Sequence, residues 1–426
     1  MGARARPGPH DDGAASSRPP RRSLAALLVL ALLALGACDR EVDLEPPRPD
    51  DVAVGRDDSG AQRVLDRFVG ALAQGDEDAV LATAAPDARS LLGAVATNAQ
   101  ALRLDKLSLR YVDDVAVTGA ERDRWGRAAW AATVELRFGL RGLDQRAARV
   151  DTRVLLVPAG GEVRIAGFGG AGADRTPLWL TGPTTVVRTP RTLVEVAGDT
   201  AGRYPGLVTR AVTQVRRTLP GWDGPLVVEV PRDQAALEAA VSAPEGEYDA
   251  IAAVTTTVDG STRRGAPVRV YVNPGVFGDL RPQGAQVVMS HEAAHVATGA
   301  SFTSVPTWLL EGFADAVALR DAGVPVQTAA AQVLERIRSD GLPDGLPSRE
   351  DLDPRASDLG ATYEEAWLAC RFVADEFGQA ALVRLYDAVS AGTPVRRAFV
   401  DQLGVTQAEF VSRWRADLAS LAGVAR

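Results

Sequence analysis

The sequence contains only three histidines, and two of them lie four residues apart in His291-Glu292-Ala293-Ala294-His295. In a helix, residues at this spacing share one face, so both imidazoles can bind the same metal ion. Glu292 lies about one residue's rotation away, where its carboxylate can reach a water molecule rather than the metal. The pattern therefore predicts a zinc site with a general base beside it. The alternative is a pair of solvent-facing histidines on an amphipathic helix.

A third metal ligand must come from elsewhere in the chain. His10 lies in a segment that we expect to be removed, and the longer pattern H-E-x-x-H-x-x-G-x-x-H fails because Thr298 and Ser301 stand where it needs glycine and histidine. A catalytic zinc with three protein ligands then needs a carboxylate. We expect Glu311 to be this ligand, and Asp315, four residues further on, to orient one ligand histidine. The alternative is an acidic pair on a solvated helix face.

Two helices are expected to position these groups. Residues 283–298 have the apolar spacing of a helix, with Pro282 suited to its first turn and Gly299 suited to its end. Residues 306–321 predict a second amphipathic helix that begins at Pro306. The two helices are separated by a short loop, so their polar faces can meet.

The motif HEAAH at 291–295, followed by WLLEGFAD at 308–315, resembles the gluzincin branch of HExxH zinc peptidases, and in particular the peptidase MA-like proteins. The similarity covers residues 184–426 and is concentrated at 268–320. It implies a zinc metallopeptidase acting on peptides or proteins, with Glu292 as general base and a glutamate completing the metal site. The gap from His295 to Glu311 is shorter than in thermolysin-like enzymes.

The same resemblance implies two further features of the site. In this family, the strand before the helix with the two histidines borders the active-site cleft, and extended substrate pairs with that strand. Val268–Val272 is the candidate for this strand, and the alternative is an ordinary internal strand. A downstream tyrosine or histidine often donates a hydrogen bond to the oxyanion. Tyr363, which begins a helix after a polar loop, is the best placed of the six tyrosines, and the alternative for it is packing at a helix start.

Residues 1–37 have the features of a lipoprotein signal peptide. Arginines precede an apolar run at 24–35 that is too short to span a bilayer comfortably. Leu35-Gly36-Ala37-Cys38 resembles the bacterial lipobox, which implies cleavage before Cys38 and a lipid anchor at the extracytoplasmic face of the cell membrane. The alternatives are an uncleaved anchor and an ordinary secretory signal. Cys370 is the only other cysteine, so no intramolecular disulfide is expected.

The remaining pattern predicts an α+β protein with two domains. Residues 38–60 are acidic and contain prolines, as in a flexible tether. Helices followed by an antiparallel meander at 61–170 resemble an NTF2-like domain. The glycine- and proline-rich segment 171–183 predicts a linker. A mixed sheet and a helical C-terminal half at 184–426 form the zincin-like domain that the resemblance implies.

Charge and composition limit the classes of molecule that this protein is expected to bind. The net charge is −8 and the basic residues form no stripe, which argues against nucleic acid. Lys106 is the only lysine, so arginine supplies nearly all positive charge. A rival function is a non-catalytic, zinc-containing lipoprotein that binds peptide or cell-envelope ligands, although the presence of Glu292 favours catalysis. A third hypothesis places the function in the N-terminal domain.

Overall fold

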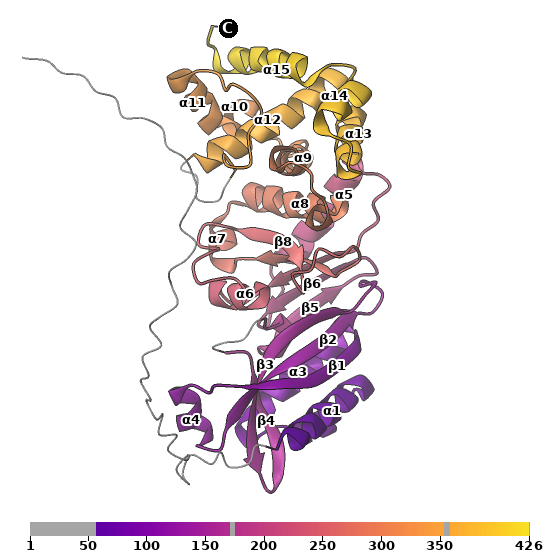
Figure 1. The fold of residues 1–426 in the computed structure, drawn as a ribbon, viewed down its shortest axis with the longest axis vertical. Helices are drawn as coiled ribbons and strands as arrows, with labels where there is room; N and C mark the ends of the chain where they lie inside the picture. Colours follow the sequence, from indigo (N-terminus) through magenta and orange to yellow (C-terminus); the bar gives the residue numbers. More distant parts are fainter. Residues whose placement is uncertain (1–56, 171–174, 353–357, 426) are drawn as a thin grey trace, which may run out of the picture. The chain divides into compact units, whose positions relative to one another are not determined.

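The structure is a computed structural model that describes residues 57–170, 175–352 and 358–425 (Figure 1). The predicted signal peptide and Cys38 lie outside these residues, as does almost all of the predicted tether. Within the described ranges, no helix combines the length and apolar character needed to cross a membrane. The prediction of an α+β fold is confirmed, because helices accompany one antiparallel sheet and one mixed sheet.

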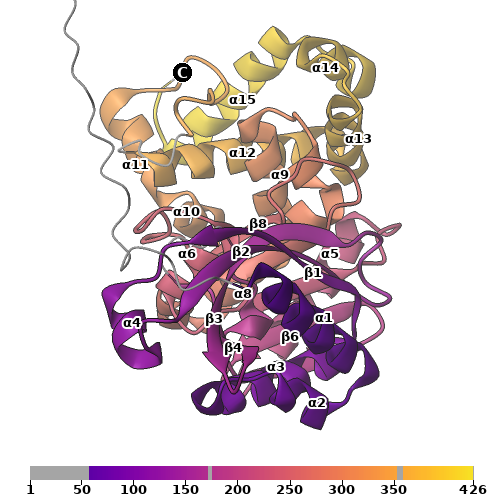
Figure 2. The ribbon, with the colours of Figure 1, turned by 60° about the horizontal axis from the view of Figure 1, so that its bottom comes forward.

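The first sheet is an antiparallel meander that begins after a group of helices. Apolar residues of α1 recur at helical spacing and are buried, so this face packs on the sheet, next to β1 and β4 (Figure 2). The strands follow in sequence order, and α4 lies between the first two. The elements are α1 (Asp58–Gln74), α2 (Glu77–Ala82), η2 (Pro86–Ala88), α3 (Arg89–Leu102), β1 (Leu104–Val115), α4 (Gly119–Trp125), β2 (Trp130–Leu140), β3 (Ala148–Ala159) and β4 (Glu162–Phe168).

The second sheet has the strand order β5-β6-β7-β9-β8. Its three central strands are parallel, and the two outer strands run antiparallel to their neighbours. β5 was not expected from the sequence. The elements are η3 (Leu178–Leu180), β5 (Thr184–Arg188), β6 (Thr192–Ala197), α5 (Tyr204–Thr218), β7 (Leu226–Val230), α6 (Gln234–Val241), β8 (Ala253–Thr257), β9 (Val268–Val272) and α7 (Pro274–Asp279).

The expectation that Val268–Val272 pairs with extended substrate is wrong, and the alternative, an ordinary internal strand, is what the structure shows. This segment is β9, which pairs with β7 on one side and with β8 on the other. The cause is the hairpin between β8 and β9, which folds the earlier strand to the outside of the sheet. Ala253–Thr257 (β8) is therefore one of the two edge strands, and it lies next to the helix that carries the two histidines.

Helices form the rest of the described chain. The predicted histidine helix is confirmed as α8, with Pro282 in its first turn and Gly299, at φ 66°, ending it in the left-handed conformation that glycine adopts readily. The elements are α8 (Pro282–Thr298), η4 (Ala300–Phe302), α9 (Thr307–Leu319), α10 (Val326–Ala329), α11 (Ala331–Asp340), α12 (Leu359–Phe377), α13 (Gln379–Ser390), α14 (Val395–Leu403) and α15 (Gln407–Ala422).

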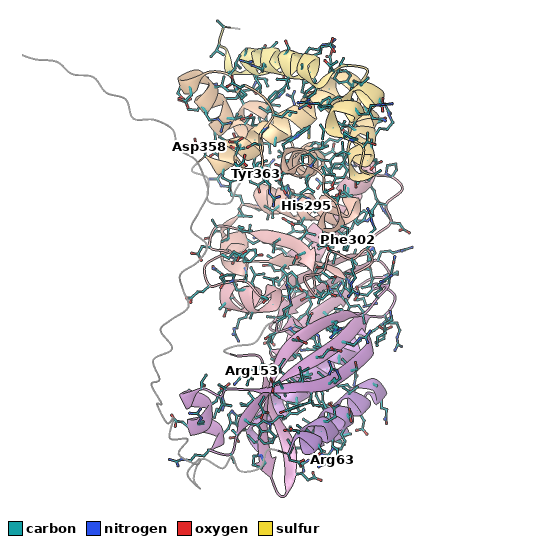
Figure 3. All side chains as sticks on the ribbon, viewed as in Figure 1. Arg63, Arg153, His295, Phe302, Asp358 and Tyr363 are labelled. Atoms are coloured by element: carbon teal, nitrogen blue, oxygen red, sulfur yellow. The ribbon has the colours of Figure 1, made fainter. Side chains whose placement is uncertain are left out.

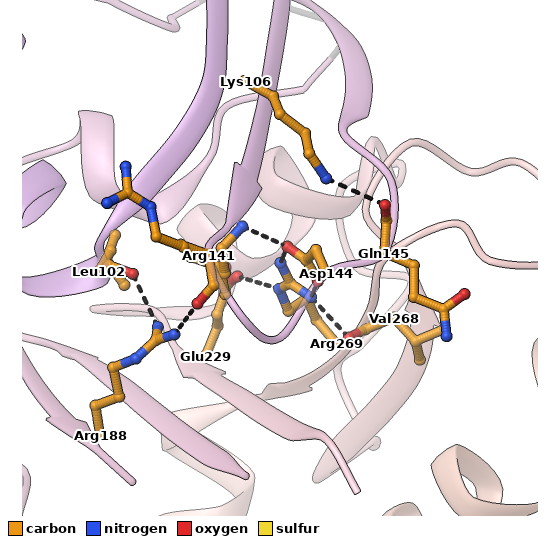
Figure 4. Close-up of polar contacts among 10 residues, drawn as sticks. Leu102, Lys106, Arg141, Asp144, Gln145, Arg188, Glu229, Val268 and Arg269 are labelled. Carbon is orange, nitrogen blue, oxygen red and sulfur yellow. Dashed lines mark hydrogen bonds and ion pairs between the residues drawn. The ribbon is translucent and has the colours of Figure 1, made fainter. Parts of the chain in front are cut away.

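The two sheets belong to one compact unit, together with the helices of the described chain. Leu193, Val227 and Val258, from the second sheet and its flank, are buried in the same core as the first sheet. Leu178–Leu180, within the segment predicted as a linker, is also buried, and Trp179 and Leu180 belong to this core. A buried ion pair joins the sheets as well: Arg269 of β9 contacts Asp144, in the loop between β2 and β3, at 2.6 Å (Figure 4).

Candidate metal centre and active site

Helices α8 and α9 bring three candidate ligand atoms together. His291 Nε2 and His295 Nε2 are 2.9 Å apart. Glu311 Oε2 lies 3.2 Å from the first nitrogen and 3.4 Å from the second. Two imidazoles one helical turn apart and a carboxylate from the neighbouring helix therefore point at one position. Figure 3 labels one of these residues, His295.

The orientation of the imidazoles suits a cation at this position. His291 Nδ1 lies 2.7 Å from Asp315 Oδ1, so a proton on Nδ1 donates to that carboxylate and the lone pair on Nε2 faces the cluster. His295 directs its own Nε2 to the same point at 2.9 Å, and two bare lone pairs at that distance repel unless a proton or a cation lies between them. Two imidazole nitrogens and one carboxylate oxygen are a donor set of catalytic zinc, so the residues fit this ion.

The electrostatics of the cluster also favour a positive charge at its centre. Burial lowers the pKa of His291, but the carboxylates of Asp315 and Glu311 outweigh this effect and raise the pKa well above its ordinary value. Burial raises the pKa of Glu311, and hydrogen bonds from both histidines more than reverse this, so the net shift is downward. The side chains are only 16 %, 9 % and 14 % exposed for His291, His295 and Glu311, which limits screening by water.

The side chain of Glu292 is hydrogen-bonded to strand β8 and not to the candidate ligand residues. Its carboxylate Oε2 accepts a hydrogen bond of 2.6 Å from Thr255 Oγ1 on β8, and its carbonyl oxygen lies 3.2 Å from the same hydroxyl. Glu292 is itself buried. Sequence reasoning did not identify Thr255, because three threonines follow one another at 255–257 and only the strand register selects one of them.

These groups line one cavity of about 310 Å³. Tyr363, near the start of α12, reaches the same cavity, and Figure 3 shows it near His295. Burial is the main cause that raises the pKa of Tyr363, and the carboxylates of Glu311 and Asp315 add to it. The phenol therefore keeps its proton at physiological pH and can act as a hydrogen-bond donor.

The structure thus brings every predicted site residue between 291 and 363 to one place, from three helices. Cys38 lies outside the described residues. A scan against protein-family models found no match to this chain, and a search of curated proteins found none either.

Proposed function

We propose that this protein is a zinc-dependent peptidase that hydrolyses peptide bonds. The observation that carries the proposal is the convergence of His291 Nε2, His295 Nε2 and Glu311 Oε2 within 3.4 Å of one another. Glu292, one residue from a ligand and not part of the ligand set, supplies the carboxylate that a hydrolytic site needs. A purely structural zinc site requires no such second group.

Each residue then has a separate role. A zinc ion held by the two histidines and Glu311 would supply a Lewis acid that polarises the scissile carbonyl and lowers the pKa of water toward 7. Glu292 accepts a proton from the attacking water as its oxygen adds to the carbonyl carbon, and later passes that proton to the leaving amine. Tyr363 donates a hydrogen bond to the oxygen that becomes negative in the tetrahedral state.

The edge strand β8 suits the binding of an extended peptide. One side of β8 pairs with β9, and no further strand of the described sheet pairs with its other side. Ile251, Ala253 and Thr255 line the cavity beside Glu292. A peptide added to this edge would be held through its backbone, largely independently of its sequence.

We further propose that the chain is a peptidase MA-like gluzincin with an NTF2-like N-terminal domain. The HEAAH and WLLEGFAD motifs and the helix-then-meander order of α1 to β4 support this assignment. The arginine-led apolar run before Cys38 supports a lipoprotein held at the extracytoplasmic face of the cell membrane. There it would act on peptide or protein substrates.

The test combines metal content with cleavage of a peptide library, using the chain from residue 39. We expect one zinc per wild-type chain and cleavage that a chelator abolishes. Glu292→Gln should keep the zinc and lose hydrolysis, whereas Glu311→Ala should lose both. Cleavage by Glu292→Gln at the wild-type rate would remove Glu292 from its role. Zinc binding by the wild type without any cleavage would instead support the non-catalytic binding protein.

A further inference from the structure

A second cavity, of about 560 Å³, lies away from the metal centre. It is formed by the solvent-facing side of the first sheet, the loop between β2 and β3, and the loop between β8 and β9. Five cationic side chains line it and only one carboxylate, although the whole chain carries a net charge of −8. The cationic residues are Lys106, Arg137, Arg146, Arg149 and Arg263, and the carboxylate is that of Asp259.

The positive charges in this cavity are poorly balanced by the protein. Arg137 on β2 is directly opposite Arg149 on β3, and like charges at this position destabilise a sheet. Arg149 forms an ion pair with Glu135 at 2.5 Å. Arg137, Arg146 and Arg263 have no carboxylate within ion-pair distance among the described residues. Three guanidinium groups of the cavity therefore form no ion pair in the described part of the chain; the nearby Glu135 carboxylate acts on Arg137 but is shared with Arg110 and Arg149.

The backbone at Lys106 is also unusual. Lys106 adopts φ 55°, in the left-handed region that residues other than glycine rarely occupy, and the pairing of β1 with β2 shifts register between Asp105 and Ser108. This bulge directs the only lysine of the chain into the cavity, where its Nζ donates to the carbonyl oxygen of Gln145 at 3.1 Å (Figure 4). Strained backbone of this kind is typical of functional positions.

The loop between β8 and β9 adds a hydrogen-bonding group without a partner. Ser261 lines the cavity, and its Oγ is buried with no hydrogen-bond partner in the part of the chain that the structure describes. The carboxylate of Asp259 forms a hydrogen bond within its own loop: its Oδ1 accepts from the Ser261 N–H at 3.0 Å. A buried hydroxyl without a partner is costly unless a ligand or water satisfies it.

We propose that this cavity binds a phosphate-bearing anion. Guanidinium groups bind phosphate oxygens in bidentate fashion, and an ammonium and a hydroxyl supply further donors. A phosphate carries up to two negative charges and three acceptor oxygens, so it neutralises clustered arginines better than one carboxylate does. The cavity volume is that of small-molecule sites, and the absence of a basic stripe on the chain favours a small ligand or a headgroup over a nucleic acid.

The test is calorimetric titration with inorganic phosphate and with pyrophosphate at low ionic strength. Wild type should bind one ligand per chain at this cavity, and the double variant Arg137→Gln/Arg263→Gln should bind at least about tenfold more weakly because two charged donors are lost. Lys106→Gln should weaken binding in the same direction. Arg384→Gln, which removes an exposed arginine of α13, should leave the affinity unchanged. Both arginines of the double variant are exposed, and Arg137→Gln also removes the repulsion with Arg149, so the variant without ligand should unfold at the melting temperature of wild type or above it.

Two probes distinguish the sources of the phosphate. Sedimentation with vesicles of phosphatidylglycerol in phosphatidylcholine, compared with pure phosphatidylcholine, reports binding to a lipid headgroup. Soluble phosphate binding that depends on Arg137 and Arg263 without vesicle binding assigns the cavity to a free phosphate compound, and vesicle binding with the same dependence assigns it to a headgroup. Binding that the double variant retains in full, as phosphate bound at the metal centre would be, overturns the proposal, and so does no binding in either assay.

Discussion

Three carboxylates lie near the two imidazoles, and each makes different contacts, which fit the role proposed for it. Glu311 contacts both ring nitrogens of the cluster, at 3.2 and 3.4 Å. Asp315 lies behind His291, at 2.7 Å from the opposite ring nitrogen. Glu292 is held by a threonine hydroxyl at 2.6 Å and forms no hydrogen bond to either imidazole in the described structure. The groups proposed as metal ligand, orienting group and general base thus differ in their contacts, although all three are carboxylates.

The Thr255 hydroxyl is predicted to position Glu292. Thr255→Val removes a hydrogen bond to a charged group, so we expect kcat to fall by about tenfold or more while the zinc content stays the same. Thr255→Ser should restore most of the activity. Thr256→Val is the matched control, because neighbouring side chains on a strand point to opposite faces. A Thr255→Val variant with the kcat of wild type would show that Glu292 needs no such support.

Asp315 is predicted to strengthen metal binding through His291. Asp315→Asn keeps the shape but removes the charge that holds the Nδ1 proton, and loss of such a partner lowers metal affinity by about 10- to 100-fold. Competition with a fluorescent zinc chelator measures this change. Asp321→Asn, which alters an acid paired with Arg217 beyond the end of α9, should have no effect. Equal affinities for the two variants would contradict the role of Asp315.

At the scale of elements, the site depends on how closely α9 approaches α12. Gly312, next to the proposed ligand Glu311, lies where an added Cβ would be 2.3 Å from the Ala366 carbonyl oxygen and 2.9 Å from Cys370 Sγ. Both neighbours are buried in the core. A glycine is therefore required here because two helix backbones touch, and α12 in turn brings Tyr363 to the cavity.

Gly312→Ala should destabilise the protein even though alanine favours helices. The clash is with backbone, so we expect the free energy of unfolding to fall by about 1–3 kcal/mol, and the displaced α9 to bind zinc more weakly. Urea unfolding and metal titration measure the two effects. Gly70→Ala in α1, where an added Cβ meets nothing within 4 Å, should instead raise stability by up to about 1 kcal/mol. Equal stability changes in the two variants would contradict the close approach.

At the scale of the whole described unit, buried charges join the two sheets. Arg269 is 1 % exposed and forms two hydrogen bonds to Asp144, at 2.9 and 2.6 Å, while its Nε lies 3.3 Å from Glu229 Oε1 on β7 (Figure 4). One guanidinium thus faces two carboxylates. Burial raises the pKa of Glu229 to about 7; Arg269 opposes this shift and Asp144 adds to it.

This network predicts a pH dependence of stability. A carboxyl whose pKa is higher in the folded state than its ordinary value binds its proton more tightly when folded. The stabilisation is therefore complete below about pH 4.5 and is lost as pH rises toward 7, by roughly 1–3 kcal/mol. Urea unfolding at pH 5, 6, 7 and 8 measures the loss.

Glu229→Gln should reduce this loss of stability, because its side chain does not ionise. Glu365, whose pKa burial also raises to about 7, should account for part of the slope that persists in the variant. Glu245→Gln, at an exposed position, should leave the slope unchanged. A Glu229→Gln variant with the wild-type slope would mean that Glu229 does not titrate in this range.

Local patterns were sufficient to predict most elements and the site residues on them. The spacing of His291 and His295 predicts a shared face wherever the helix lies, since that depends on the helical repeat alone. Pro282 and Gly299 marked the ends of α8 for equally local reasons. The same repeat places Glu311 and Asp315 on one side of α9. Because no third histidine is expected in the mature chain, the third ligand of a zinc site has to be a carboxylate, which favours this pair.

Local sequence patterns could not predict the features that depend on which strands pair. Val268–Val272 has the composition of a strand at any position in a sheet, so its internal place emerged only from the hairpin that puts β8 outside it. The contact of Thr255 with Glu292 follows from the same hairpin. The basic cavity combines residues from distant segments, from Lys106 to Arg263, and no local pattern joins them.

The sequence by itself was enough to select the candidate metal ligands, because residue types and helical spacing are short-range properties. Tertiary structure decided which strand borders the cavity, which hydroxyl contacts the Glu292 carboxylate, and where the arginines of the basic cavity gather in the described chain. These depend on sheet order and on packing between residues far apart in the chain, which are set by burial of the whole core rather than by any one segment.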